Sequence, residues 1–170
     1  MAITNETATE SATESTTNQY LTFMLDGAEY GVDILRVQEI KGWDTATRIP
    51  NTPEFVMGVI NLRGTVVPVI DLRRRFELDP LEYSNTTVVV IVKVQSDAKR
   101  EHTFGFVVDA VSEVYSVPHE NIKPPPEVGT SVNIDFVKGL VTVDEKMLIL
   151  LDIDNLVDSH MQMDEEEAVH

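Results

Sequence analysis

The chain has 170 residues, which suffices for one ordinary domain or for two small units packed together. It contains no cysteine, which excludes disulfides, thiolate nucleophiles and cysteine metal sites and suits a reducing cytosol. The formal net charge of −16 repels nucleic-acid phosphates, and no apolar stretch approaches the roughly 20 residues of a membrane-spanning helix. We therefore expect a soluble, cytoplasmic protein with no nucleic-acid partner and no direct membrane insertion.

Both ends of the sequence are polar. Residues 1–18 are rich in Ser, Thr and Glu and cannot bury enough apolar surface to offset their conformational entropy, so a disordered N-terminal tail is expected. Residues 159–170 contain no lysine or arginine and are expected to form an acidic C-terminal tail. The structured domain is accordingly predicted to span residues 19–158.

The first predicted elements form a hairpin. Residues 20–25 are predicted to be a strand, Asp26-Gly27 its turn and residues 29–32 the return strand. The next segment, residues 33–40, mixes apolar and charged residues in a way that suits a helical turn leading into a strand. Its apolar side chains are expected to pack in the core: Ile34, Val37 and Ile40.

A second hairpin is predicted further along the chain. Thr52 followed by proline predicts an N-cap and a short helical turn over residues 53–57. Two aliphatic strands then flank Arg63-Gly64, which we expect to form the hairpin tip. Asp71 is predicted to cap a short helix over residues 72–76.

The second half of the chain repeats the first. The five residues beginning at Phe55 recur at Phe136, and in both copies an aspartate follows sixteen residues after the phenylalanine. An earlier block, residues 30–40, recurs in residues 104–114. We infer two related units of about 70 residues, each rich in short strands. Such units predict a mainly β fold of two compact barrels that share an apolar interface, with a groove between them as the natural place for a partner.

No constellation of residues indicates catalysis, a cofactor or a bound metal. The four histidines stand at no metal-ligand spacing from one another and are expected to be solvated: His102, His119, His160 and His170. Residues 152–155 resemble the start of a calcium loop but lack its later ligands, so Asp154 is predicted to cap a helix. A pair of carboxylates brought together by the fold is an alternative, but nothing in the sequence marks one pair.

Two further segments have alternative interpretations. Residues 73–75 are three consecutive arginines, expected on the wet face of a short helix, with docking to an acidic partner as the alternative. Residues 123–126, Lys-Pro-Pro-Pro, predict a stiff linker, with a ligand for a proline-recognition domain as the alternative.

Four segments, taken in order, closely resemble the CheW-type coupling proteins of bacterial chemotaxis: YGVDILRVQEI, TRIPNTPEFVMGVINLRGTVVPVIDLRRRF, VVDAVSEV and MLILLDI. The resemblance implies two SH3-like, five-stranded β-barrels on a shared hydrophobic core, with short helices. The barrels would occupy approximately residues 19–85 and 86–158, with strand exchange between them left open. It also implies a non-catalytic adaptor that joins the cytoplasmic tips of methyl-accepting chemotaxis receptors to the C-terminal regulatory domain of the histidine kinase CheA, in membrane-associated arrays.

The resemblance implies site residues as well. Six positions match those linked in the family to receptor or kinase coupling: Val37, Glu39, Gly58, Arg63, Val88 and Val114. The three valines are expected to line the groove between the units, and Gly58 is expected to permit close approach of two surfaces. Arg63 and Glu39 have opposite charge and are expected to pair with each other or with the partners.

Two alternatives stay open at this point. One is an adaptor of the same fold in a related chemosensory pathway, such as pilus-driven motility. The other is a small β-barrel enzyme or nucleic-acid binder. The second repeat closes its matching hairpin around Asp144-Glu145-Lys146, so the scaffold does not require an arginine at this tip. We therefore predict that Arg63 serves coupling and contributes little to folding.

Overall fold

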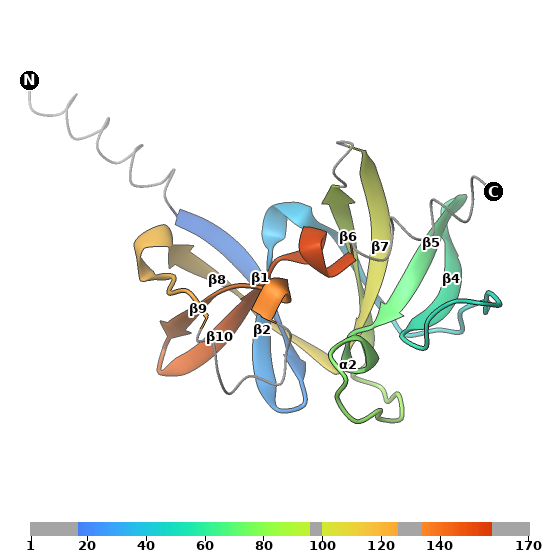
Figure 1. Cartoon of the computed structure of the whole chain (residues 1–170), viewed down its shortest axis with the longest axis horizontal. Helices are drawn as coiled ribbons and strands as arrows, with labels where there is room; N and C mark the ends of the chain where they lie inside the picture. Colours follow the sequence, from blue (N-terminus) through green and yellow to red (C-terminus); the bar gives the residue numbers. More distant parts are fainter. Residues whose placement is uncertain (1–16, 96–99, 126–133, 158–170) are drawn as a thin grey trace, which may run out of the picture.

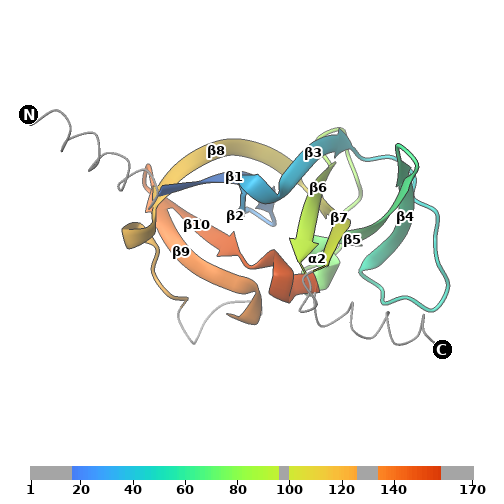
Figure 2. The same ribbon diagram turned by 90° about the horizontal axis from the view of Figure 1, so that it is seen from above.

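A computed structural model describes residues 17–95, 100–125 and 134–157. In these ranges ten strands form two five-stranded sheets, placed side by side in Figures 1 and 2. The strand β1 begins at Thr17, so the last two residues assigned to the N-terminal tail belong to a strand. The rest of that tail and the acidic C-terminal tail lie outside the described residues.

The two sheets have corresponding strand orders. Sheet A runs in the order β8 (Ala110–Pro118), β1 (Thr17–Leu25), β2 (Ala28–Asp33), β10 (Lys146–Leu151), β9 (Val137–Val143). Sheet B runs in the order β3 (Val37–Gly42), β6 (Val88–Gln95), β7 (Glu101–Val108), β5 (Thr65–Asp71), β4 (Val56–Leu62). Each sheet contains one parallel pair, β10 with β2 and β5 with β7.

Each half of the chain supplies strands to both sheets. If β1 to β5 are matched with β6 to β10, as the sequence repeat suggests, the order of sheet A becomes the order of sheet B. The first repeat places β1 and β2 in sheet A and β3, β4 and β5 in sheet B. The second repeat places β6 and β7 in sheet B and β8, β9 and β10 in sheet A. A division near residue 85 therefore separates the repeats of the sequence and not the two sheets.

Three hairpins close with two-residue turns. Their central residues are Asp26-Gly27, Arg63-Gly64 and Asp144-Glu145, and all six have positive φ. This is the type I′ geometry, whose twist matches that of the flanking strands. The predicted turns at Asp26-Gly27 and Arg63-Gly64 are confirmed by the pairing of Leu25 with Ala28 and of Leu62 with Thr65.

The helices are short. As predicted, a helical turn, η1 (Ile34–Arg36), leads into β3, and Asp71 caps α2 (Leu72–Arg75) by accepting a hydrogen bond from the Arg73 N–H. Two more 3₁₀ turns are η2 (His119–Asn121) and η3 (Ile134–Phe136). The short helical turn predicted over residues 53–57 is wrong in its extent. The chain makes only a turn there, and Val56 already pairs with Ile70 at the start of β4, where its β-branched side chain suits a strand.

The main hydrophobic core lies between the two sheets. It combines Phe23 and Tyr30 of sheet A with Phe106 of sheet B and with Phe76 and Phe136, while smaller apolar clusters fill each sheet. The strand β6 contributes Val90 and Val92 to the shared core and Val89 and Ile91 to the cluster inside sheet B. Burial on both faces explains why this strand is a continuous aliphatic run in the sequence. The shared core expected from the resemblance is present.

A single backbone bridge joins the outer strands of each sheet. Thr47, which follows β3, exchanges two hydrogen bonds with Val59 of β4, at 2.9 and 2.8 Å. Lys123, which follows β8, does the same with Leu140 of β9, at 2.8 Å in both directions. Val59 and Leu140 are equivalent in the repeat, so both sheets curl in the same way.

Candidate functional site

A groove lies on sheet A, beside the turn η1 that leads into sheet B. Residues 17–19 of β1 and Ser116 of β8 form its sheet A side, and residues 33–35 form the other side, at the crossover from sheet A to sheet B. Leu35, on η1, is 85% exposed, although it is a large apolar residue. The groove is thus built from uncharged polar groups around one solvent-exposed leucine, with Asp33 as its one ionisable group.

None of the three valines predicted to line a groove lines this one, although two of them lie close to its lining residues along the chain. Val37 directly follows η1, is partly buried and packs against the shared core. Val114 lies two residues before Ser116 on β8, so both side chains point to the same face of the strand, and it is 47% exposed. The edge strands that carry these valines, β3 and β8, run along the same upper side of Figure 2.

The third valine lies elsewhere. Val88 is opposite Gly42 and Val108, whereas Val37 is opposite Val92, at the other end of the same ladder. Val88 and Val92 are four residues apart along β6, or about 13 Å. Val88 is partly buried against the shared core, as Val37 is, and it does not line the groove.

Arg63 and Glu39 pair with each other. The Arg63 guanidinium lies 2.7 Å from a carboxylate oxygen of Glu39, across the gap between β4 and β3. The side chain of Arg63 is 78% exposed and that of Glu39 is 24% exposed. Surface pairs of this kind contribute little to stability, typically less than about 1 kcal/mol, and the exposed arginine remains accessible to another protein.

The backbone of Arg63 is also unfavourable for an arginine. Its φ is +51°, in the left-handed region, which costs a residue other than Gly, Asn or Asp roughly 1 kcal/mol. The other two hairpin turns place an aspartate at the same position, Asp26 and Asp144. Turn chemistry therefore does not explain this arginine.

Gly58 is required by the fold itself. It is buried with a φ of +134°, and a Cβ atom built on it would lie 2.2 Å from the carbonyl oxygen of Thr47. Gly139, its counterpart in the second repeat, is also crowded, with a Cβ built on it lying 2.9 Å from the carbonyl oxygen of Lys123. The close approach predicted for Gly58 is therefore made by the chain segment that bridges the outer strands of sheet B.

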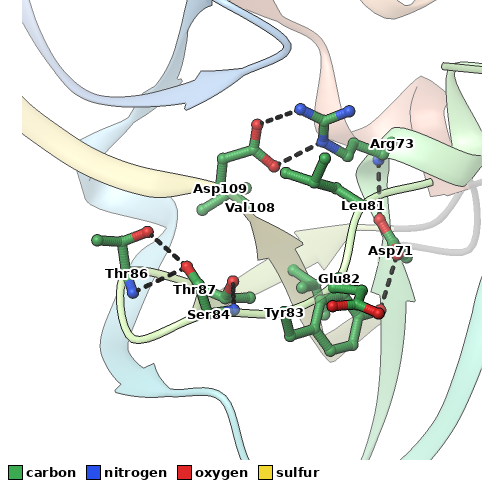
Figure 3. A pocket seen from close by; sticks show the side chains of 11 residues that line it. Asp71, Arg73, Leu81, Glu82, Tyr83, Ser84, Thr86, Thr87, Val108 and Asp109 are labelled. Carbon is green, nitrogen blue, oxygen red and sulfur yellow. Dashed lines mark hydrogen bonds and ion pairs between the residues drawn. The ribbon is translucent and has the colours of Figure 1, made fainter. Parts of the chain in front are cut away.

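The three consecutive arginines do not form one wet face. The Arg73 side chain is 10% exposed and binds Asp109 through two hydrogen bonds of 2.7 Å (Figure 3). The hydrogen bonds that Arg73 donates to Asp109 raise the pKa of Arg73. In the same small pocket, the Tyr83 hydroxyl donates to Asp71 at 2.7 Å, and burial followed by this hydrogen bond raises the pKa of Tyr83.

Arg75 is held between the two repeats. Its guanidinium carbon lies 4.8 Å from the centre of the Phe55 ring and 4.3 Å from that of Phe136, and these phenylalanines are equivalent in the repeat. It also donates to the carbonyl of Leu156 at 3.1 Å, and burial lowers its pKa. Both interpretations of the cluster from sequence, a wet face and a docking patch, are thus wrong for Arg73 and Arg75.

The predicted helix cap at Asp154 is also wrong. The cap is Asp152, which accepts a hydrogen bond from the Asn155 N–H at 3.1 Å, at the start of the helical residues 153–157. Asp154 instead binds Arg36 through two hydrogen bonds, of 3.0 and 2.8 Å. In the described part of the chain, no three His, Cys, Asp or Glu side chains are arranged to hold a metal ion.

The family model of the CheW-like domain matches residues 19–161. The chain belongs to the CheW-like family. It is 43% identical over 153 residues to the chemotaxis protein CheW of Klebsiella aerogenes, covering 90% of this chain and 89% of the relative. It is 32% identical to CheW of Bacillus subtilis, over 90% and 91% of the two chains. The resemblance seen in the sequence is confirmed.

The fold agrees with a solved member of the family. The scaffolding protein TtCheW of Thermoanaerobacter tengcongensis superimposes with a TM-score of 0.74 at 37% identity, covering 83% of this chain and 88% of that one. Within the described residues, no helix has the length and hydropathy needed to span a bilayer. The chain is thus a chemotaxis protein of the CheW adaptor and scaffold family.

Sequence reasoning missed Leu35 and the polar residues that share its groove. Leu35 stands between Asp33 and Arg36 and was considered only as part of a helical turn. One signal was available in the sequence. Ile34, Val37 and Ile40 were the residues of this segment expected in the core, which left Leu35 as its one apolar side chain with no expected core position. The other missed feature, the Arg36–Asp154 pair, joins positions 118 residues apart and has no local signal.

Proposed function

We propose that this chain is a non-catalytic adaptor that couples methyl-accepting chemotaxis receptors to the histidine kinase CheA. The observation that carries the proposal is the groove on sheet A beside η1, with Leu35 exposed in it and with Val114 exposed on β8, the strand that also supplies Ser116 to the groove. Membership of the CheW-like family supports the proposal. The protein would act in cytoplasmic arrays beneath the receptors.

The groove suits the tip of a receptor helix. An amphipathic helix docks by laying its apolar face into a groove that offers apolar contacts within a polar rim. Leu35 and Val114 supply exposed apolar surface, while Asn18, Gln19 and Ser116 supply polar groups at the rim. Docking there would remove two large apolar side chains from water.

Arg63 and Glu39 would form a second contact, with the kinase. Arg63 is exposed at the hairpin tip after β4, in a turn conformation that arginine does not favour, and its partner Glu39 lies partly buried on the outer strand β3. An arginine maintained against local preference is consistent with selection for binding. Val88 and Gly58 would influence this surface indirectly, through the packing of β6 and β4.

Reconstitution with receptor-containing membranes and a CheA-type kinase tests the proposal. The measurement is receptor-dependent kinase autophosphorylation, together with co-sedimentation of the adaptor and of the kinase. We expect the wild-type chain to raise receptor control of the kinase and to sediment with the membranes. An unchanged kinase rate, with neither partner bound, would contradict the adaptor function.

Two variants separate the two contacts. Leu35→Asp is expected to reduce sedimentation with receptor membranes, while Arg63→Ala is expected to reduce binding of the kinase. Met147→Asp is the matched control for the first, since Met147 is a 60% exposed apolar residue outside the groove. If Met147→Asp and Leu35→Asp reduced receptor binding equally, the groove would not be the receptor site.

A further inference from the structure

The two repeats of the chain have the same geometry after their last strand. The Asp71 N–H donates to the carbonyl of Phe55 at 2.8 Å, and the Asp152 N–H donates to that of Phe136 at the same distance. These residues are equivalent in the sequence repeat, and in each repeat a short helix follows the aspartate. Equivalent positions of the two helices can therefore be compared.

Two ion pairs connect the repeats, and their charges are reversed. In one, Arg73 of the first repeat binds Asp109 of the second through two hydrogen bonds of 2.7 Å (Figure 3). In the other, Asp154 of the second repeat accepts two hydrogen bonds, of 3.0 and 2.8 Å, from Arg36 of the first. Arg73 and Asp154 are equivalent, since each stands two residues after the capping aspartate. The same position thus carries opposite charges in the two repeats.

The partners of these two residues also occupy corresponding places. Asp109 lies between β7 and β8, and Arg36 lies directly before β3, the two places where a repeat crosses from one sheet to the other. In the sequence repeat Arg36 aligns with Ala110, the residue after Asp109. Each ion pair thus joins the helix of one repeat to the sheet crossover of the other.

The charges at these positions fit only unlike repeats. Two first repeats packed in the same way would set Arg73 against Arg36, and two second repeats would set Asp154 against Asp109. The Arg73 side chain is only 10% exposed, so water would screen its repulsion from another cation weakly. In the arrangement that the chain adopts, each guanidinium instead binds a carboxylate through two bonds, which is the strongest and most directional form of such a pair.

Arg75 adds a contact that only the first repeat can supply. Its guanidinium carbon lies 4.8 and 4.3 Å from the ring centres of Phe55 and Phe136, and it donates to the carbonyl of Leu156, its own equivalent in the second repeat. A residue that contacts its own equivalent lies close to the axis that relates the repeats. Two first repeats would therefore bring two arginines to this place, where burial already makes one charged group costly.

We propose that Arg36, Arg73, Asp109 and Asp154 form a recognition surface by which each repeat selects the complementary repeat through charge. The occupant of this surface is the other repeat of the same chain. Selection is required because the repeats share one fold and have apolar faces that differ little in chemistry, and a specific interface needs repulsion of the wrong partner as well as attraction to the right one. The proposal does not rest on the adaptor function.

Two full-length variants test the proposal. Arg73→Asp leaves two carboxylates at the first ion pair, and Asp109→Arg leaves two guanidiniums there. The connection from α2 to β6 lies outside both sheets, so two copies can exchange repeats. Exchange between identical copies keeps the repulsion, whereas exchange between the two variants restores opposite charges at both junctions.

The variants are unfolded in urea and refolded, separately and as an equimolar mixture. We expect each variant alone to have a lower urea midpoint than the wild-type chain or no cooperative transition. The mixture should form a dimer with one copy of each variant, identified by sedimentation velocity and native mass spectrometry, and should unfold at a higher midpoint than either variant. A mixture that behaves as the sum of its separate components would overturn the proposal.

An ion pair within one repeat provides the matched control. Lys93 and Glu101 lie 3.5 Å apart on neighbouring strands of the second repeat, so an exchange of repeats cannot separate them. A mixture of Lys93→Glu and Glu101→Lys should therefore remain monomeric after the same treatment. Dimers of one copy each in this control mixture would overturn the proposal, because association would then not depend on charges at the junction of the repeats.

Discussion

Arg63 illustrates how a single residue can be at odds with its local structure. Its side chain pairs with Glu39 at the surface, where such pairs are worth little, and its φ of +51° disfavours arginine. Neither local geometry nor the ion pair accounts for its presence. The binding role that we propose for Arg63 would account for it, and would separate the effects of substitution on stability from those on coupling.

Arg63→Asn is therefore expected to leave the free energy of unfolding unchanged or to raise it by up to about 1 kcal/mol, because Asn-Gly is the preferred sequence for a type I′ turn. Receptor-dependent kinase activity should fall at the same time. Urea denaturation and the reconstituted kinase assay measure the two effects. Lys146→Ala, which removes a cation beside the equivalent hairpin, is the control, and a marked loss of stability in Arg63→Asn would indicate a structural role instead.

Gly58 behaves in the opposite way. We expect Gly58→Ala to lower the free energy of unfolding by about 3 kcal/mol or more, because its Cβ would collide with backbone at Thr47 and its φ is positive. The urea midpoint measures the loss. Gly42→Ala is the matched control, since a Cβ there has no neighbour within 4 Å. Similar midpoints for both variants would show that the backbone at Thr47 can move away from the new Cβ atom at little cost in free energy.

At the scale of elements, α2 and the loop after it form a clamp. Arg73 joins α2 to Asp109, at the crossover from β7 to β8, and also donates to the carbonyl of Asp79 at 2.8 Å. Tyr83 returns to Asp71 at the start of the helix and packs on Trp43 with ring centres 4.5 Å apart. A four-residue helix is not stable alone, so these contacts determine its position.

The clamp predicts a pH dependence. Burial tends to raise the pKa of Asp109, but hydrogen bonds from Arg73 and from the Asp26 N–H outweigh it, and the net pKa lies below the ordinary value. The folded state thus binds this proton less readily than the unfolded chain, so the stabilisation is present above about pH 4 and is lost as the pH falls further.

Asp109→Asn should therefore lower the free energy of unfolding by about 3 kcal/mol at pH 7, because Arg73 keeps its burial but loses its charged partner. The difference between variant and wild type should shrink between pH 5 and about pH 3. Urea titrations at several pH values measure it, with Glu54→Gln as an exposed-acid control. A difference that stayed constant over this range would contradict the role of the ion pair.

Local elements were predictable where local chemistry determines them. The turns at Asp26-Gly27 and Arg63-Gly64 and the cap at Asp71 follow from residue types at fixed spacing. The extent of the helical turn predicted over residues 53–57 was wrong because the pairing of Val56 in β4 overrides a good N-cap signal. The burial of the Arg73 and Arg75 side chains had no signal in the local sequence, since their partners are distant along the chain.

At the scale of the molecule, the repeat predicted two related units but could not say which strands share a sheet. The spatial order depends on crossovers after β2 and β7, where each repeat passes from one sheet to the other. The groove arises at the first of these crossovers, at residues 33–35, so the candidate site could not be located before the exchange was known. Of the predicted site residues, none lines the groove, and Arg63 pairs with Glu39.

The exchange also implies that neither half of the chain can fold alone. Residues 1–85 would contain β1 and β2 without the rest of sheet A, and β3, β4 and β5 without the central strands β6 and β7 of sheet B. Two-stranded pieces with an uncovered apolar face are at best marginally stable in water. The shared core would also lose about half of its side chains, because both repeats contribute to it.

We therefore expect fragments 1–85 and 86–170 each to lack a cooperative thermal transition by circular dichroism, and an equimolar mixture to recover one. The cut lies in the loop between α2 and β6, outside both sheets, so it removes no strand pairing from the mixture. The intact chain should unfold in one step, with Trp43 fluorescence in sheet B and total β-structure changing together, because the sheets share their core. A fragment that folded cooperatively by itself would show that its strands can close a sheet without exchange.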